Sequence, residues 1–178
     1  EDQIEPIILV DVGTNTEVVI GNRDRLLAAS CPAGPAFEGG EVTFGMPGYE
    51  GAIESVHIDN DGVHFETIGG APPEGICGSG LVDLLAELVR TKNMNELGVL
   101  ENGGSEFTVV PERGITISRA DMSALAQAKA ANYCGQWIVM REHGTAPEDL
   151  TRLYLAGGFA NYINVDNARD IGFIANVP

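Results

Sequence analysis

Positive charge is scarce in this sequence. Its 178 residues contain 10 lysines and arginines against 26 aspartates and glutamates, which gives a formal net charge of −16 at pH 7. An acidic surface repels the phosphate backbone of a nucleic acid, so we expect no nucleic-acid partner. The excess of carboxylates favours solubility, and it could also steer a basic protein partner towards the chain.

Long apolar runs and paired cysteines are also lacking. No run approaches the ~20 residues needed to cross a bilayer, so we expect no membrane partner. The cysteines Cys31, Cys77 and Cys134 form no Cys-x-x-Cys pair, which argues against a zinc ribbon or a disulfide framework. Such usage suits a cytoplasmic location, with each thiol a small buried group. The 44% hydrophobic content is ordinary for a globular protein, and we expect residues 1–178 to form a single domain.

The first informative segment, residues 7–20, is a polar turn between two apolar runs. Asp11 stands at the entrance of the turn, Gly13 lets the backbone approach a ligand closely, and the hydroxyls of Thr14 and Thr16 follow. Exposed amides and hydroxyls at such a turn can donate to phosphate oxygens, and one carboxylate can hold a hydrated Mg²⁺. The alternative is an ordinary hairpin with a Gly-Thr-Asn turn.

A glycine pair follows a short apolar run near the end of the chain. Residues 153–158 read Leu-Tyr-Leu-Ala-Gly-Gly, which predicts a strand that ends at Gly157 and Gly158. Without side chains at these two positions, a flat ring can lie against the backbone.

Two further glycine-rich segments lie between these motifs. Residues 33–39 read Ala-Gly-Pro-Ala-Phe-Glu-Gly, and residues 75–81 read Gly-Ile-Cys-Gly-Ser-Gly-Leu before a helix expected over 81–91. A glycine-rich helix start offers free amides and the positive end of the helix dipole, which favours an anion site at Gly78 and Ser79. Ser79 could instead cap the helix, with the glycines serving close packing. Both interpretations stay open.

The order of these four motifs resembles a known family. The early hairpin and the late Ala-Gly-Gly turn resemble the second phosphate loop and the adenosine loop of the acetate and sugar kinase, heat-shock cognate and actin superfamily. With segments 33–39, 75–81 and 155–163, the chain is similar to the C-terminal half of the reductive activators of corrinoid proteins, over about residues 7–174. The resemblance implies an α/β, ribonuclease-H-like (actin-like ATPase) fold, in which helices flank a mixed sheet with antiparallel first three strands.

The same resemblance assigns residues to a site for ATP and Mg²⁺. Asp11 would hold Mg²⁺, and Glu38 would position water or the metal. Phosphate oxygens would be bound by Gly13, Thr14, Asn15 and Thr16, adenosine would be flanked by Gly157 and Gly158, and the helix start at Gly78 and Ser79 would add further contacts to the nucleotide.

Two features of this family have no counterpart in the sequence. Members close two related domains around ATP, whereas this chain has one phosphate hairpin, and family activators also carry an N-terminal iron-sulfur domain. The first residue is Glu1 rather than Met. We therefore expect residues 1–178 to be the C-terminal half of a two-domain ATPase module cut from a longer chain. By itself this half should be inactive, and the iron-sulfur cluster should belong to a missing domain.

The favoured function is part of the ATP-dependent return of an inactive Co(II) corrinoid protein to Co(I). The expected partners are the corrinoid protein of a methyltransferase system and the missing N-terminal domains of the same protein. Three alternatives stay open. They are half of a sugar or acetate kinase, an activator of 2-hydroxyacyl-CoA dehydratases in which Cys31 or Cys77 ligates a shared cluster, and a docking module that kept the fold but lost hydrolysis.

The remaining pattern predicts the other elements. Strands are expected over 7–10, 16–20 and 25–30, a hairpin over 51–59 and 63–68, helices over 81–91 and 118–143, and short helices over 148–150 and 165–171. Ser118 is the expected cap of the long helix and Gly144 its stop. Trp137 is expected on the buried face of that helix, and so is a stripe of alanines, namely Ala124, Ala126, Ala128, Ala130 and Ala131. Residues 98–113 are expected to be irregular.

Overall fold

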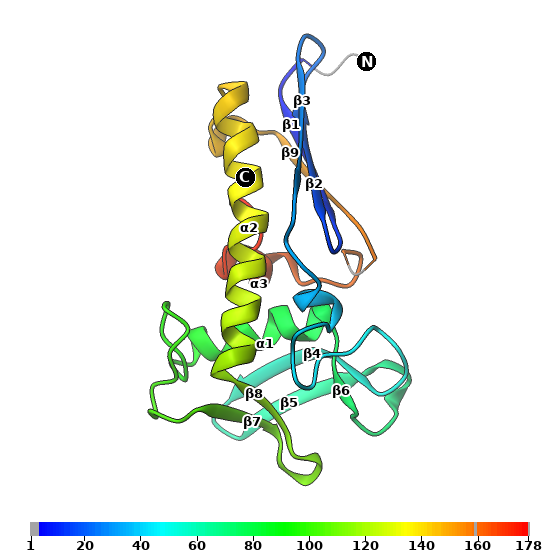
Figure 1. The fold of residues 1–178 in the computed structure, drawn as a ribbon, viewed down its shortest axis with the longest axis vertical. Helices are drawn as coiled ribbons and strands as arrows, with labels where there is room; N and C mark the ends of the chain where they lie inside the picture. Colours follow the sequence, from blue (N-terminus) through cyan, green and yellow to red (C-terminus); the bar gives the residue numbers. More distant parts are fainter. Residues whose placement is uncertain (1–3, 159, 178) are drawn as a thin grey trace.

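Three sheets and three α-helices are built by residues 4–158 and 160–177, the residues that this computed structural model describes (Figure 1). The strands are β1 (Ile7–Val12), β2 (Thr16–Gly21), β3 (Leu26–Cys31), β4 (Ala52–Asp59), β5 (Gly62–Thr67), β6 (Gly75–Ile76), β7 (Glu106–Val110), β8 (Ile115–Ser118) and β9 (Arg152–Ala156). The α-helices are α1 (Gly78–Arg90), α2 (Arg119–His143) and α3 (Val165–Asp170). Residues 98–113 were expected to be irregular but include β7, which pairs with β8.

The sheet that carries the first motif has the strand order β3-β2-β1-β9. β1, β2 and β3 are antiparallel neighbours, and β9 joins β1 in parallel. The alternation of a strand explains the two faces of β1, because Ile8, Val10 and Val12 are buried while Leu9 and Asp11 are exposed. The predicted mixed sheet, with three antiparallel first strands, is therefore confirmed.

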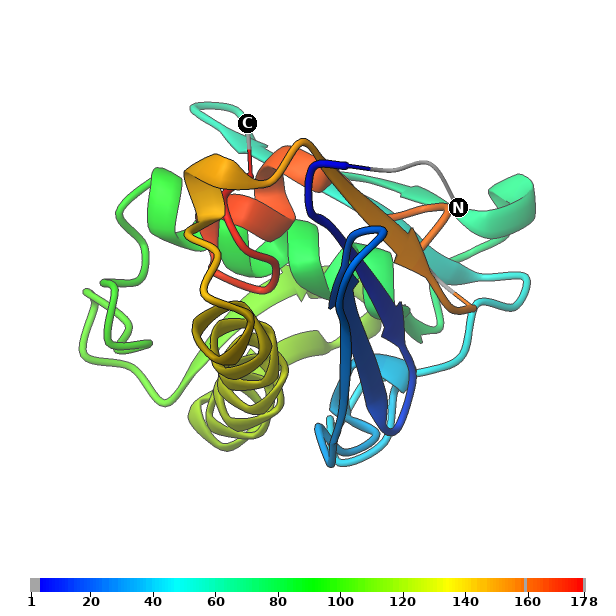
Figure 2. The same cartoon turned by 90° about the horizontal axis from the view of Figure 1, so that it is seen from above.

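The long helix α2 lies against one face of this sheet (Figure 2). Ser118 caps its first turn, and Gly144 ends it in a left-handed conformation, both as predicted. The helix turns Gly135 towards the sheet, where a Cβ would lie 1.9 Å from the Cys31 sulfur. This contact marks the buried face of α2. Trp137 lies on a different face of the helix and is 47% exposed, so its predicted burial is wrong.

Two further predictions about burial are corrected. Of the alanine stripe, Ala128 is buried, but Ala126 and Ala130 are exposed. Among the cysteines, Cys134 is exposed rather than buried. Within the described residues, no helix is both long enough and apolar enough to cross a membrane.

A second sheet, in the order β5-β4-β6, supports the helix α1. Leu81, Leu84 and Leu88 of α1 have no exposed surface, and the helix packs on β4. Gly80 permits this close packing, because a Cβ there would lie 2.3 Å from the carbonyl oxygen of Ile53. Figure 1 shows this second layer below the four-stranded sheet, at the end to which β1 and β9 point.

The contact between α2 and the loop before β4 depends on Asp121, which is 3% exposed. One carboxylate oxygen accepts hydrogen bonds from the backbone and the hydroxyl of Thr43, at 2.8 and 2.9 Å. The other accepts from the backbone and the hydroxyl of Ser118, at 2.8 and 2.7 Å. Burial by itself raises the pKa of Asp121, but these hydrogen bonds outweigh it and leave the pKa below its ordinary value.

Replacing Asp121 with alanine should lower the free energy of unfolding at neutral pH by about 3 kcal/mol, because four hydrogen-bond donors lose a buried, charged acceptor. Since the folded-state pKa is depressed, this stabilisation is complete above the unfolded value of about 3.9 and is lost as the pH falls through the folded value. Urea titrations from neutral to strongly acidic pH measure both effects. Glu112→Ala, at an exposed carboxylate, is the control, and equal effects of the two substitutions would contradict this role of Asp121.

Candidate functional site

The parallel pairing of β1 with β9 brings together two motifs that are far apart in the sequence. Asp11 of β1 is paired with Ala156 of β9, so both strands end at the same edge of the sheet. The hairpin turn after Val12 and the glycine pair after Ala156 therefore lie side by side. Ligands of α/β proteins bind at the carboxyl ends of parallel strands, which makes this edge the candidate site.

The two glycines after β9 have different surroundings. Gly157 has a φ of +109°, and a Cβ there would lie 2.0 Å from the carbonyl oxygen of Val12. A Cβ at Gly158 would meet no atom within 4 Å. Gly157 is thus needed for the close approach of the two strands, whereas Gly158 leaves open space. Phe159, the next residue of the predicted motif, lies outside the described residues.

The motif that contains Glu38 is fastened to the predicted phosphate hairpin. The N–H of Gly34 donates to the carbonyl of Thr14 at 2.9 Å, and the hydroxyl of Thr14 donates to the carboxylate of Glu38. Phe37 holds the same motif in the core, with its ring edge-on to Phe173 at 4.9 Å between ring centroids. Glu38 is therefore held beside the hairpin.

A cavity of about 540 Å³ lies among these motifs, within the size range of small-molecule sites. Four of the predicted site residues line it, namely Glu38, Gly78, Ser79 and Gly158. Apolar side chains form much of the remaining wall, contributed by Val12, Phe37, Met46, Pro47, Ile68 and Tyr162. The other predicted residues are not among the described lining residues, although Asp11 and Gly13 adjoin Val12 and Gly157 adjoins Gly158. Asp11, Thr14 and Asn15 are exposed.

The start of α1 forms one wall of the cavity. Cys77 is the N-cap residue and no side chain caps the helix, so the interpretation of Ser79 as the cap is wrong. Ser79 is 3% exposed, and its hydroxyl lies 3.4 Å from the Cys77 sulfur. The contact of Gly80 with β4 confirms the packing role for that glycine. Gly78 and Ser79 line the cavity at the positive end of the helix, where an anion is stabilised.

Thr16, a predicted phosphate ligand, lies in the core. It has no exposed surface, and its hydroxyl has no hydrogen-bond partner among the described residues. The alternation of β2 gives the reason, because Thr16 points to the same face as the buried Val18 and Ile20. Thr14 is therefore the threonine whose side chain the hairpin exposes, and the assignment of Thr16 to phosphate stays a prediction.

The cavity is acidic as well as apolar. Glu38 and Glu54 line it, and no lysine or arginine is found among its described lining residues. Across residues 4–158 and 160–177, no three histidine, cysteine or carboxylate side chains are grouped so as to hold a metal ion. Asp11 is a single exposed carboxylate at the end of β1, which suits a magnesium ion that keeps most of its water. A bound polyphosphate would need that cation, and further positive charge from another segment, to offset its own.

A protein-family comparison supports the same interpretation as the geometry. Residues 5–178 match the family described as the C-terminal domain of RACo, the ASKHA domain. The chain belongs to this RACo C-terminal domain family. A solved structure of a reductive activator for corrinoid, iron-sulfur protein superimposes on 98% of the chain, with a TM-score of 0.89 and 37% sequence identity. The actin-like ATPase fold expected for a RACo C-terminal domain is therefore confirmed.

Two named proteins are similar in sequence to this RACo C-terminal domain. The corrinoid activation enzyme RamQ of Eubacterium limosum is 37% identical over 194 residues, which cover 96% of this chain and 33% of RamQ. A Co(II) methylated amine-specific corrinoid protein reductase of Methanosarcina barkeri is 27% identical over 198 residues, which cover 96% of this chain and 35% of the reductase. The match covers 31% of the solved activator. The chain thus spans about a third of the length of these relatives.

Sequence reasoning missed the apolar wall of the cavity. Met46 and Tyr162 come from two separate loops and Ile68 from a short 3-10 helix after β5, and no local pattern distinguishes them from core residues. Cys77 lay within a predicted motif, but its spacing indicated only a buried thiol. Folding alone brings these side chains to one place, so no sequence signal could have grouped them.

The unequal surroundings of the glycine pair can be tested by adding one methyl group at each position. Gly157→Ala should lower the free energy of unfolding by about 2–4 kcal/mol, because its Cβ meets the Val12 carbonyl and its backbone has a positive φ. Gly158→Ala should change it by less than about 0.5 kcal/mol, since its Cβ enters open space. Urea titrations measure both, and equal destabilisation would contradict the close approach of β1 and β9.

Proposed function

We propose that this chain is the ATP-binding half of an ATP-dependent reductive activator, which returns a Co(II) corrinoid protein to Co(I). The observation that carries the proposal is the pairing of β1 with β9, which sets the phosphate hairpin and the glycine pair side by side at one cavity. Membership of the RACo family, and relatives named for corrinoid activation and reduction, support it. The proposed partners are a corrinoid protein of a methyl-transfer system and the other domains of the same protein.

The lining of the cavity suits ATP. The apolar wall at Met46, Ile68 and Tyr162 can cover a purine, and the open space at Gly158 lets the ring approach the backbone. The first amides of α1 and the exposed hairpin offer donors for phosphate oxygens. When bound with Mg²⁺, ATP supplies the free energy that an uphill electron transfer requires.

The hairpin residues have distinct proposed tasks. Asp11 holds Mg²⁺ through its water, and the backbone at Gly13 and Asn15 donates to phosphate oxygens. The Thr14 hydroxyl now donates to Glu38. When a phosphate oxygen accepts this hydrogen bond in place of Glu38, the carboxylate of Glu38 is free to orient a water molecule. Phosphate binding and the availability of Glu38 are thereby linked.

The acidity of the cavity limits what this half does alone. Glu38 and Glu54 face a ligand that is itself anionic, and the described lining contains no lysine or arginine. Phosphoryl transfer depends on positioning and on the stabilisation of negative charge, both of which a second domain would complete. Hydrolysis is therefore proposed for the longer protein and not for residues 1–178 by themselves.

The proposed function is tested with the intact protein, a low-potential electron donor and the cognate corrinoid protein. We expect the Co(II) absorbance to give way to that of Co(I) only when Mg-ATP is present. Asp11→Asn should slow this step at least about a hundredfold, because the magnesium ion loses its carboxylate. Asp61→Asn, in the exposed turn between β4 and β5, is the matched control and should have no effect.

Two results would overturn the proposed function. One is formation of Co(I) at an equal rate without ATP. The other is phosphorylation of a sugar or of acetate while no Co(I) forms, which would establish the kinase alternative in its place.

A graded series at Gly158 tests where the nucleotide lies. Gly158→Val should weaken ATP binding by the intact protein at least about tenfold, because the branched side chain fills the space left for the ring. Gly158→Ala should have a smaller effect in the same direction. Isothermal calorimetry measures both affinities, and urea titrations check that the variants stay folded. Unchanged ATP affinity of a folded Gly158→Val protein would show that the purine binds elsewhere.

A further inference from the structure

The cavity has two walls that come from distant segments. Gly78 and Ser79 belong to the start of α1, whereas Gly158 and Tyr162 belong to the turn before α3. α1 and α3 also contact each other directly. The separation of the two walls therefore depends on how α3 is fixed to α1.

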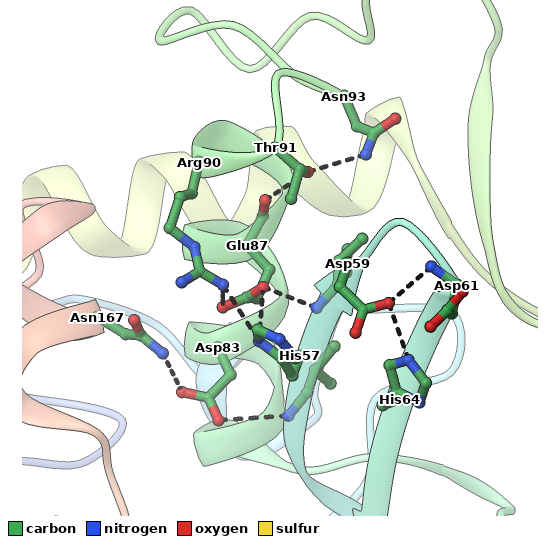
Figure 3. Close-up of polar contacts among 12 residues, drawn as sticks. His57, Asp59, Asp61, His64, Asp83, Glu87, Arg90, Thr91, Asn93 and Asn167 are labelled. Atoms are coloured by element: carbon green, nitrogen blue, oxygen red, sulfur yellow. Dashed lines mark hydrogen bonds and ion pairs between the residues drawn. The ribbon is translucent and has the colours of Figure 1, made fainter.

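One side-chain hydrogen bond joins α3 to α1. Asn167 of α3 donates from its Nδ2 to Oδ1 of Asp83 in α1 at 2.7 Å, and Figure 3 shows the two side chains meeting between the helices. Asp83 is 7% exposed, and a carboxylate shielded from water makes a strong hydrogen bond. The backbone N–H of Asn167 donates in turn to the side chain of Asn164, the cap of α3, at 3.1 Å. Asp83 is thus connected to the segment that carries Tyr162.

The second oxygen of Asp83 fixes α1 to β4. It accepts a hydrogen bond from the N–H of Val56 at 3.3 Å. One turn further along α1, Glu87 accepts from the N–H of Ile58 at 2.7 Å. Four helical residues rise by ~6 Å and two strand residues by ~6.6 Å, which is why both carboxylates reach the strand.

Glu87 provides an internal comparison for Asp83. It is 3% exposed and supports β4 in the same way, and it also pairs with Arg90 and His57 (Figure 3). None of its contacts recorded among the described residues involves α3. The difference between the two carboxylates is therefore the hydrogen bond from Asn167.

We propose that Asp83 is a positioning residue of the nucleotide site, which joins the cavity wall at the start of α1 to the wall before α3. Asp83 does not line the cavity and acts through Asn167. Loss of this hydrogen bond lets the segment before α3 move relative to α1, so the width of the cavity is no longer fixed. The statement about ATP rests on the proposed function, whereas the connection between the two walls does not.

The test uses Asp83→Ala, Asn167→Ala and the double variant in the intact protein, with Glu87→Ala as the control. Amide hydrogen exchange over residues 160–167 and ATP affinity by calorimetry are the two measurements. Asp83→Ala and Asn167→Ala should each speed exchange in that segment about tenfold and weaken ATP binding about tenfold. The double variant should be no worse than Asp83→Ala, because both substitutions remove one interaction. Glu87→Ala should leave both measurements near the wild-type values.

Each outcome decides the matter. If Glu87→Ala matches Asp83→Ala in exchange and in ATP affinity, the carboxylate only supports β4 and the proposal is wrong. Should Asp83→Ala fail to fold, Asn167→Ala removes the same hydrogen bond from its half-buried end and carries the test. If the wild-type protein does not bind ATP, the proposed function fails, and exchange over residues 160–167 still shows whether Asp83 joins the two walls.

Discussion

The parallel pairing of β1 with β9 is the constraint on which the rest of the structure depends. Asp11 and Ala156 are partners in this pairing, and Gly157 lies so close to Val12 that a Cβ would meet its carbonyl oxygen at 2.0 Å. No residue with a side chain allows that approach at a φ of +109° without strain. The glycine therefore decides whether the phosphate hairpin and the turn at Gly158 share one cavity. Gly157 is needed for the pairing of β1 with β9, and that pairing forms the candidate ligand site.

The described lining of the cavity carries negative charge and no fixed positive charge. Glu38 and Glu54 line it, the described lining contributes no cationic side chain, and the sequence carries a net charge of −16. A polyphosphate placed there gains donors from the start of α1 and from the hairpin, but it finds no fixed positive charge to offset its own. In the proposed function, Mg²⁺ held at Asp11 would supply part of that charge. The chain spans about a third of the length of its relatives, and in the proposed function the other domains of the longer protein would supply the rest of that charge.

The sequence predicted much of what depends on neighbours along the chain. The three antiparallel strands, the capping of α2 by Ser118 and its stop at Gly144 follow from local patterns, and each is confirmed. The direction in which a side chain faces depends instead on packing between distant elements. Trp137 is exposed because Gly135 occupies the contact with β3. Thr16 is buried because side chains alternate along β2 and that of Thr16 lies on the face that packs in the core. The link from Asp83 to Asn167 was invisible for the same reason, since it joins residues that are 84 positions apart in the sequence.

The hydroxyl of Thr14 connects the proposed phosphate site to the core. It donates to Glu38, which follows Phe37, and the ring of Phe37 packs edge-on against Phe173. The carbonyl of Phe173 accepts a hydrogen bond from Gln136 of α2 at 3.0 Å. A phosphate that takes the Thr14 hydroxyl must break the contact with Glu38, so its affinity includes the cost of that exchange. Any contact that draws Glu38 away from Thr14 therefore strengthens phosphate binding. By reciprocity, bound phosphate strengthens that contact by the same factor. Under the proposed function, the motif around Glu38 is therefore a place where another domain could act on nucleotide affinity without touching the nucleotide.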